Sequence, residues 1–166
     1  MASLTLLGKP CTTNGELPAV GSKAPDFKLT DKTLNDLTLD DFAGKKKIIS
    51  TVPSLDTAGC AKYTKIFDEK FGGRDDVALL VVSADLPFAQ DRYCDINKTV
   101  NITALSLMRS KKFAKDYGIL LQDGPLAGLC ARSVTVLDEN NRVLHTELVS
   151  EVSQEPDFDA AMAAIS

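Results

Sequence analysis

A strand, a helix and a second strand follow one another between residues 47 and 83, and this run constrains the fold most. Residues 47–52 form a largely β-branched run that ends at Pro53, and residues 77–83 form a second apolar run. Between them, residues 60–71 carry apolar or aromatic side chains at the spacing of one helical face, namely Tyr63, Ile66, Phe67 and Phe71. A unit of this length is predicted to be a βαβ unit with parallel strands and a right-handed crossover.

The rest of the chain adds elements on both sides of this unit. Before it we expect an N-terminal hairpin within residues 3–13 that turns at Gly8–Pro10, short strands over 27–29 and 36–39, and a helical turn over 40–44 that ends at glycine. After it we expect a helix over 87–93, a strand over 102–105, a helix over 111–117, a hairpin of strands 133–137 and 142–149, and a closing helix over about 156–165. This order predicts an α/β protein of thioredoxin-like fold, with a central mixed β-sheet flanked by helices and an added N-terminal β-hairpin over about residues 1–20.

Length and charge narrow the class of protein. The 166 residues, 44% of them hydrophobic, suffice for one core, so we expect a single domain over residues 1–166. The net charge of −4 argues against nucleic acid and anionic membranes as partners. Residues 1–7 lack the features of a secretion signal and no apolar stretch has the length of a membrane span, so we expect a cytoplasmic protein.

Four scattered cysteines suggest thiol chemistry. Cys11, Cys60, Cys94 and Cys130 are too few for a disulfide-rich scaffold in a chain of this length. The sequence has no C-x-x-C pair and one histidine, so we expect no metal site. Reduced, reactive thiols remain the more informative interpretation.

Cys60 occupies the position where such a thiol becomes reactive. The segment from Val52 to Cys60 leaves a buried strand and enters a helix, and active sites of open α/β sheets collect at that end of the strands. A cysteine in the first helical turn faces free backbone N–H groups, which favour the thiolate. Thr57 can place a hydroxyl beside the sulfur, and Pro53 can wall the pocket without an N–H donor. The alternative is a buried small side chain at Cys60 and an ordinary N-cap at Thr57.

Several segments resemble one known family. Residues 53–60, Pro-Ser-Leu-Asp-Thr-Ala-Gly-Cys, resemble the peroxidatic motif of the thiol peroxidase family of peroxiredoxins, and residues 83–94, which end at Cys94, resemble its resolving-cysteine segment. Ala131-Arg132-Ser133 lies where the active-site arginine of that family is expected. Residues 41–45, 138–140 and 149–152 also match, so the resemblance covers essentially the whole chain.

The resemblance implies a reaction and its residues. Pro53, Thr57, Cys60 and Arg132 are expected to form the peroxide site, with Cys60 as the peroxidatic and Cys94 as the resolving cysteine. The enzyme is then expected to reduce hydrogen peroxide and organic hydroperoxides to water and alcohols through a Cys60 sulfenic acid and an intramolecular Cys60–Cys94 disulfide. A thioredoxin-type dithiol protein recycles it, a homodimer is expected, and no bound cofactor is implied.

The other interpretations of these residues remain open. Arg132 can instead be a solvated strand residue, and Cys94 an incidental thiol. Cys130, two residues before Arg132, can compete as a resolving thiol or be inert, and the same holds for Cys11. Cys60 and Cys94 are predicted to begin different helices, so a disulfide between them requires local unwinding of both segments.

Two rival functions use the same thiols. A thiol-disulfide oxidoreductase exchanges disulfides without peroxide, although its usual C-x-x-C pair is missing. A peroxide-sensing redox protein reports peroxide to a partner and has no need for rapid turnover. Sustained turnover with a reductant separates a peroxidase from both.

Overall fold

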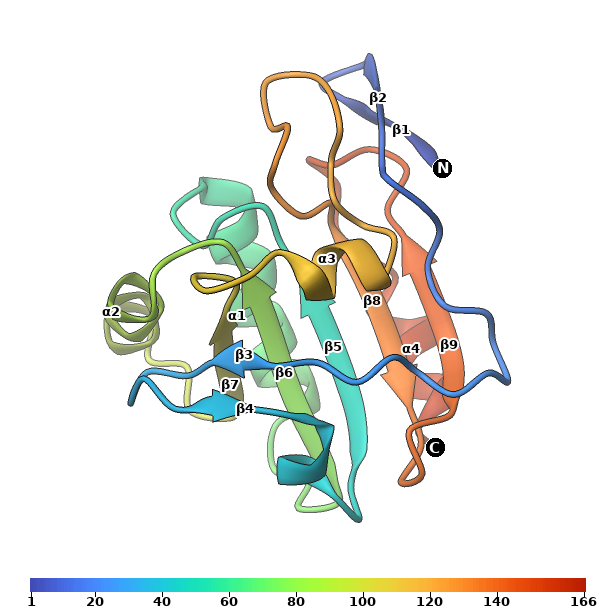
Figure 1. Cartoon of the computed structure of the whole chain (residues 1–166). Coiled ribbons are helices and arrows are strands. Elements are labelled where there is room, and N and C mark those ends of the chain that lie inside the picture. The colour runs from blue at the N-terminus through green and yellow to red at the C-terminus, as the bar shows by residue number, and fades with distance from the viewer.

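Nine strands, four α-helices and one 3-10 helix form an α/β fold in the computed structural model, which describes residues 1–166 (Figure 1). The strands are β1 (Ser3–Leu6), β2 (Lys9–Thr12), β3 (Leu29–Thr30), β4 (Asp36–Leu37), β5 (Lys46–Thr51), β6 (Val77–Ser83), β7 (Ile102–Ser106), β8 (Ser133–Leu137) and β9 (Val143–Leu148). The helices are η1 (Leu39–Phe42, 3-10), α1 (Ala58–Phe71), α2 (Pro87–Asn97), α3 (Lys112–Asp116) and α4 (Phe158–Ala164).

Seven of the strands form one mixed sheet in the order β4-β3-β7-β6-β5-β8-β9. The three strands β5, β6 and β7 run parallel, whereas β8 and β9 continue the sheet antiparallel on one side and β3 and β4 on the other. Strands β1 and β2 form a separate two-stranded hairpin. The predicted central mixed sheet with an added N-terminal hairpin is therefore confirmed.

Helix α1 buries a slightly different face from the predicted one. Its buried residues are Cys60, Thr64, Phe67, Asp68 and Phe71, whereas Tyr63 and Ile66 are half-buried. The buried set repeats every three or four residues and begins at Cys60, so the helix carries this thiol on the side that faces the sheet.

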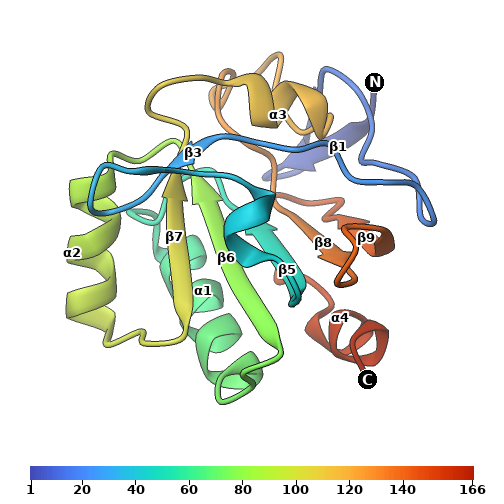
Figure 2. The same cartoon turned by 60° about the horizontal axis from the view of Figure 1, so that its bottom comes forward.

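Two hydrophobic clusters cover the two faces of the sheet. On one face Phe67 of α1 stacks on Phe158 of α4, with ring centroids 5.6 Å apart. On the other face Phe113 and Tyr117, in α3 and at its end, pack with Phe27 of the N-terminal segment. Figure 1 shows α3 in front of the sheet with α1 and α4 behind it, and Figure 2 shows the same layers from a second direction. The strand that leads to Cys60 is thus enclosed on both faces.

Two predicted features were wrong. The N-terminal hairpin turns at Leu7 and Gly8, which have φ of 50° and 79°, and Pro10 lies within β2. Helix α2 continues four residues beyond the predicted end. It ends at Asn97 because Lys98 adopts the left-handed conformation with φ of 55° and donates its N–H to the Cys94 carbonyl. Cys94 therefore lies in the last turn of α2 rather than at the beginning of a helix. The other elements begin and end within two residues of the predicted bounds.

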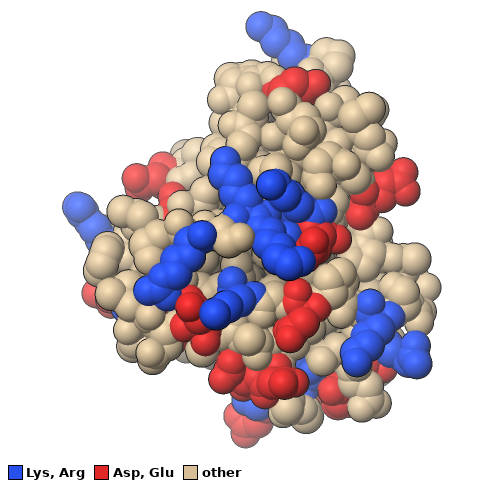
Figure 3. All heavy atoms as spheres, in the orientation of Figure 1, with Lys and Arg blue, Asp and Glu red and all other residues tan.

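The surface carries charges of both signs. Figure 3 shows basic side chains gathered over the middle of one face, with acidic side chains below and beside them. Arg109 and Lys112, before and within α3, pair with Asp36 and Asp116. None of the helices combines the length and the apolar character that a membrane crossing requires.

Candidate active site

Cys60 lies in the first turn of α1, directly after the loop that leaves β5. Thr57 is the N-cap of the helix, and its Oγ1 accepts a hydrogen bond from the Cys60 N–H at 3.4 Å. The Cys60 side chain is only 2% exposed. The unpaired N–H groups and the positive end of a 14-residue helix favour a negative charge on this sulfur.

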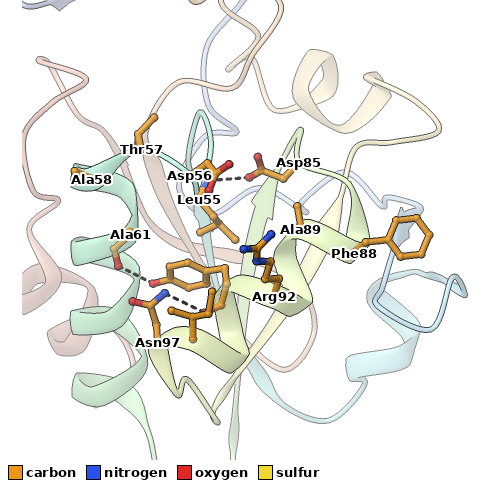
Figure 4. A pocket seen from close by; sticks show the side chains of 12 residues that line it. Leu55, Asp56, Thr57, Ala58, Ala61, Asp85, Phe88, Ala89, Arg92 and Asn97 are labelled. Carbon is orange, nitrogen blue, oxygen red and sulfur yellow. Dashed lines mark hydrogen bonds between the residues drawn. The ribbon is translucent and has the colours of Figure 1, made fainter.

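A half-buried carboxylate fixes the loop before Cys60. Asp85, which follows β6, accepts hydrogen bonds from the Ser54 hydroxyl and from the Leu55 N–H, each at 2.7 Å. Figure 4 shows the bond to Leu55. Thr57 donates its hydroxyl to the Ser54 carbonyl at 3.1 Å, and Pro53 is buried at the end of the strand. The loop is thus held from three points before the helix starts.

Arg132 reaches Cys60 from the neighbouring strand. Thr51 at the end of β5 is paired with Ser133 at the beginning of β8, and its hydroxyl donates to the Ala131 carbonyl at 2.8 Å. This pairing places Arg132 beside the α1 start, where its Nη2 donates to Cys60 Sγ at 3.0 Å. Arg132 is 2% exposed, so the alternative that it is a solvated strand residue is excluded.

Three further contacts define how the Arg132 guanidinium is held. Its Nε donates to the Val152 carbonyl at 2.8 Å, and its Cζ lies 5.2 Å from the centroid of the Tyr63 ring. Its Nη1 is buried and has no hydrogen-bond partner within the protein. A buried arginine with one free terminal nitrogen beside a thiol can stabilise negative charge on a sulfur or on an oxygen bound there.

A cleft of about 720 Å³ opens between α1 and α2 next to this site (Figure 4). Thr57 and Ala61 line it from α1, and Phe88, Arg92 and Tyr93 line it from α2. The Tyr93 hydroxyl donates to the Ala61 carbonyl at 2.6 Å and so holds the two helices together. No group of three or more His, Cys, Asp or Glu side chains is positioned to hold a metal ion.

Cys94 is separated from Cys60 in this structure. Both thiols are free, and Cys94 lines a different cavity, of about 410 Å³, together with Thr99 and Val100. Burial raises the pKa of the Cys94 thiol, and the negative charges of Asp91 and Asp68 act in the same direction. The structure therefore brings Thr57, Cys60 and Arg132 together, and leaves Cys94 on the adjacent helix.

The two remaining cysteines are enclosed in the core on the other face of the sheet. Cys130 is fully buried, and burial raises the pKa of its thiol to about 12. Cys11 is buried under the hairpin, where burial raises its pKa and the charge of Asp123 acts in the same direction. Both environments favour the neutral, unreactive thiol.

Three contributors to the site were not expected from the sequence. Asp85 fixes the loop before Cys60, the Val152 carbonyl holds Arg132, and Tyr63 lies against the guanidinium although it was placed on the core face of α1. Asp85 and Val152 fall in segments 83–94 and 149–152, which resemble the family, but the resemblance assigned no role to either residue.

The Redoxin family model matches residues 19–162 of this chain. A thiol peroxidase of Leptospira interrogans is 46% identical over 166 residues, which cover 99% of this chain and 97% of the relative. Among solved structures, a peroxiredoxin-like protein from Aquifex aeolicus superposes with a TM-score of 0.93 at 35% identity, and covers 99% of this chain and 96% of its own. A thiol peroxidase from Chromobacterium violaceum gives a TM-score of 0.91 at 25% identity, with 98% and 94% covered. The chain therefore belongs to the Redoxin family, among the thiol peroxidases of the peroxiredoxin group.

Proposed function

We propose that this thiol peroxidase reduces hydrogen peroxide and organic hydroperoxides with Cys60 as the peroxidatic and Cys94 as the resolving cysteine. The observation that carries the proposal is the 3.0 Å contact between Arg132 Nη2 and Cys60 Sγ, in which both side chains are 2% exposed. A thiol held between a helix start and a buried guanidinium is favoured as thiolate, which is the nucleophilic form.

In the first step the Cys60 thiolate attacks the terminal oxygen of the hydroperoxide. The S–O bond forms as the O–O bond breaks, the sulfur is oxidised by two electrons to the sulfenic acid, and the leaving oxygen takes a proton to become water or an alcohol. Arg132 Nη1, which has no hydrogen-bond partner within the protein, is proposed to stabilise the charge on the leaving oxygen, with Thr57 and Pro53 as the proposed borders of the peroxide.

In the second step Cys94 attacks the sulfenic sulfur, which forms the Cys60–Cys94 disulfide and releases water. A disulfide requires Cα atoms within about 7 Å and matching side-chain directions. Here both thiols are free: Cys60 is buried in the core cluster under α1, and Cys94 lies on α2, where it lines a separate cavity. The step therefore includes local unwinding of the α1 start and of the last turns of α2. This unwinding breaks the Tyr93–Ala61 hydrogen bond that joins the helices.

Recycling and assembly complete the proposal. A thioredoxin-type dithiol reduces the disulfide through a mixed disulfide, and such dithiols are kept reduced in the cytoplasm, where we place the enzyme.

A homodimer is part of the proposal, and the exposed apolar side chains of Leu86, Phe88, Ile96 and Val100 supply a surface for a second copy. Sedimentation of the wild type and of Phe88→Glu tests this assembly, since a monomeric wild type contradicts it.

The deciding experiment follows peroxide consumption by the wild type, Cys60→Ser and Cys94→Ser with thioredoxin, thioredoxin reductase and NADPH. We expect both variants to lose sustained turnover, and Cys94→Ser to retain a persistent sulfenic acid on Cys60. Undiminished turnover in Cys60→Ser contradicts the proposal and favours disulfide exchange at another thiol. Cumene hydroperoxide and hydrogen peroxide, compared side by side, separate the two substrate classes.

A further inference from the structure

The N-terminal hairpin is bonded to the segment that holds Arg132. Thr5 of β1 donates its N–H to the Ser150 carbonyl at 2.8 Å, and its own carbonyl accepts the Val152 N–H at 2.8 Å. In Figure 1 the blue hairpin lies beside the red segment that follows β9. The hairpin therefore extends along residues 150–152, although it lies outside the seven-stranded sheet.

The contact between the hairpin and residues 150–153 is called the junction below. The Glu151 carboxylate accepts five hydrogen bonds there. Oε2 accepts from the Thr5 hydroxyl at 2.6 Å and from the Gly8 N–H at 3.1 Å. Oε1 accepts from the Leu7 N–H at 2.8 Å and from the N–H and hydroxyl of Ser153 at 3.3 and 2.9 Å. Hydrogen bonds, that from Thr5 foremost, lower the pKa of Glu151 to about 2, so the carboxylate is ionised at every pH used for assays.

The junction continues into the peroxide site through one residue. Val152 follows Glu151 directly; its N–H is held by Thr5, and its carbonyl accepts the Nε of Arg132 at 2.8 Å. The Nε contact and the Nη2 contact to Cys60 belong to the same planar guanidinium, so a displacement of the Val152 carbonyl rotates the group that faces the sulfur.

We propose that Glu151 is a positioning residue for the peroxidase reaction, which locks the N-terminal hairpin onto residues 150–153 and thereby holds Arg132 in register with Cys60. This inference rests on the proposed roles of Cys60 and Arg132. The hairpin thus acquires a part in the chemistry, through contacts that lie outside the peroxide site itself.

A second carboxylate provides a matched control. Asp123 also binds the hairpin, by accepting the N–H and the hydroxyl of Thr12 at 2.8 and 3.0 Å, but it ties β2 to the loop after Leu121 and accepts no hydrogen bond from residues 150–153. Asp123→Asn therefore loosens the hairpin at its other strand without touching the Val152 carbonyl.

The test compares Glu151→Gln with Asp123→Asn in a Cys94→Ser background, by the rate of Cys60 sulfenic acid formation and by the pH midpoint of Cys60 alkylation with iodoacetamide. Glutamine keeps the shape but turns an NH2 group toward backbone donors, so the junction opens. We expect about a tenfold slower oxidation in Glu151→Gln, below the ~100-fold that a 1 Å displacement costs, and less than a twofold change in Asp123→Asn.

The direction of the alkylation midpoint separates positioning from simple charge effects. Removal of a nearby negative charge favours the Cys60 thiolate and moves the midpoint to lower pH, whereas a displaced Arg132 moves it to higher pH. We expect a shift to higher pH in Glu151→Gln, and a smaller shift of the same sign in Thr5→Val, which removes one of the five donors.

Three results overturn the inference. The first is a pH midpoint of Cys60 alkylation in Glu151→Gln that is unchanged or lower than in the parent. The second is a loss of the oxidation rate in Asp123→Asn that equals the loss in Glu151→Gln. The third applies if Glu151→Gln does not fold, and is a Thr5→Val variant with the oxidation rate and the alkylation midpoint of the parent. If Cys60 in the Cys94→Ser parent forms no sulfenic acid with peroxide, the proposed function itself is wrong, and that result is read before any variant at position 151.

Discussion

The surroundings of Cys60 and Cys94 differ in almost every respect, although the proposed cycle requires both thiols to react. Cys60 lies at the positive end of α1, is enclosed, and has Arg132 as a direct partner. Cys94 lies in the last turn of α2, near the negative end of that helix, and its partial burial, together with the charges of nearby acidic residues, raises the pKa of its thiol. One thiol is prepared for attack by the folded structure, and the other is restrained by it.

This difference teaches that the two steps depend on opposite properties of the fold. In the proposed cycle, attack on peroxide benefits from a rigid site, whereas disulfide formation requires α2 to release Cys94. Carboxylates hold both ends of that segment: Asp85 binds the loop before Cys60, and Asp68 accepts the N–H groups of Asn101 and Ile102 after α2. We therefore expect the released segment to lie between these two anchors, within residues 86–100.

The largest expected effect is on the reaction of Cys60 with peroxide, and it follows from the loss of Arg132. Arg132→Met removes the contact to Cys60 Sγ, and we expect a loss of about 100- to 1,000-fold in the rate of sulfenic acid formation, as for removal of one oxyanion donor. Arg132→Lys keeps the charge but not the fork of donors, so we expect only partial recovery. Rapid-quench mass spectrometry in the Cys94→Ser background measures the step.

Arg142→Met is the control for this substitution, because Arg142 is exposed and its guanidinium donates only to the Gly21 carbonyl. We expect wild-type rates there. Comparable losses in the two variants contradict a specific role for Arg132.

The second effect is a pH dependence confined to the Cys94 step. The folded α2 binds the Cys94 proton more tightly than the unwound segment does, so loss of that proton favours unwinding. This contribution to helix stability is complete below the ordinary thiol pKa of about 8.5 and is lost as the pH rises through the raised value. We expect disulfide formation to accelerate about tenfold per pH unit, and to continue to rise above pH 8.5.

The measurement is the rate of disulfide formation after a stoichiometric peroxide pulse, by acid quench and mass spectrometry, between pH 6.5 and 9.5. An ordinary exposed thiol levels off near pH 8.5, and a plateau there contradicts the restraint on Cys94. The same samples report the Cys60 step, which we expect to change far less.

The third effect weakens the restraint on Cys94 directly. Tyr93→Phe removes the hydrogen bond to the Ala61 carbonyl, which contributes about 1 kcal/mol net, so we expect about fivefold faster disulfide formation and an unchanged first step. Tyr117→Phe is the matched control, since Tyr117 donates to the Pro25 carbonyl on the other face of the sheet. Slower disulfide formation in Tyr93→Phe contradicts the unwinding of α2.

Hydrogen exchange locates the released segment itself. We expect the disulfide form to exchange faster than the reduced form across residues 57–63 and 87–100. Indistinguishable exchange in the two forms contradicts local unwinding.

The same comparison explains what the sequence could predict. Both ends of β6 were predicted correctly from the run Val77–Ser83, because a continuous apolar segment bounded by polar residues indicates a buried strand with clear limits. The end of α2 was missed, because Lys98 has no local preference for the left-handed conformation that closes the helix. That error left Cys94 outside the helix that contains it, and the separate prediction that Cys94 begins a helix was also wrong.

The site shows the same division. The position of Cys60 at a helix start followed from local pattern, whereas its contact with Arg132, 72 residues away, was available only through the family resemblance. The Val152 carbonyl had no sequence signal at all, since a backbone acceptor is present at every residue. Long-range contacts of backbone atoms emerge only from the fold.

The smallest expected effect concerns Cys130, the thiol nearest to Arg132 in sequence. Because Cys130 is fully buried and burial raises its pKa to about 12, it has almost no thiolate with which to attack a sulfenic acid. We therefore expect Cys130→Ala, placed in the Cys94→Ser background, to change the lifetime of the Cys60 sulfenic acid by less than twofold, with Cys11→Ala as the control. A Cys60–Cys130 disulfide in Cys94→Ser that disappears in the double variant shows a competing resolver. In that case the restraint on Cys94 selects between two partners for Cys60 as well as setting the rate of one.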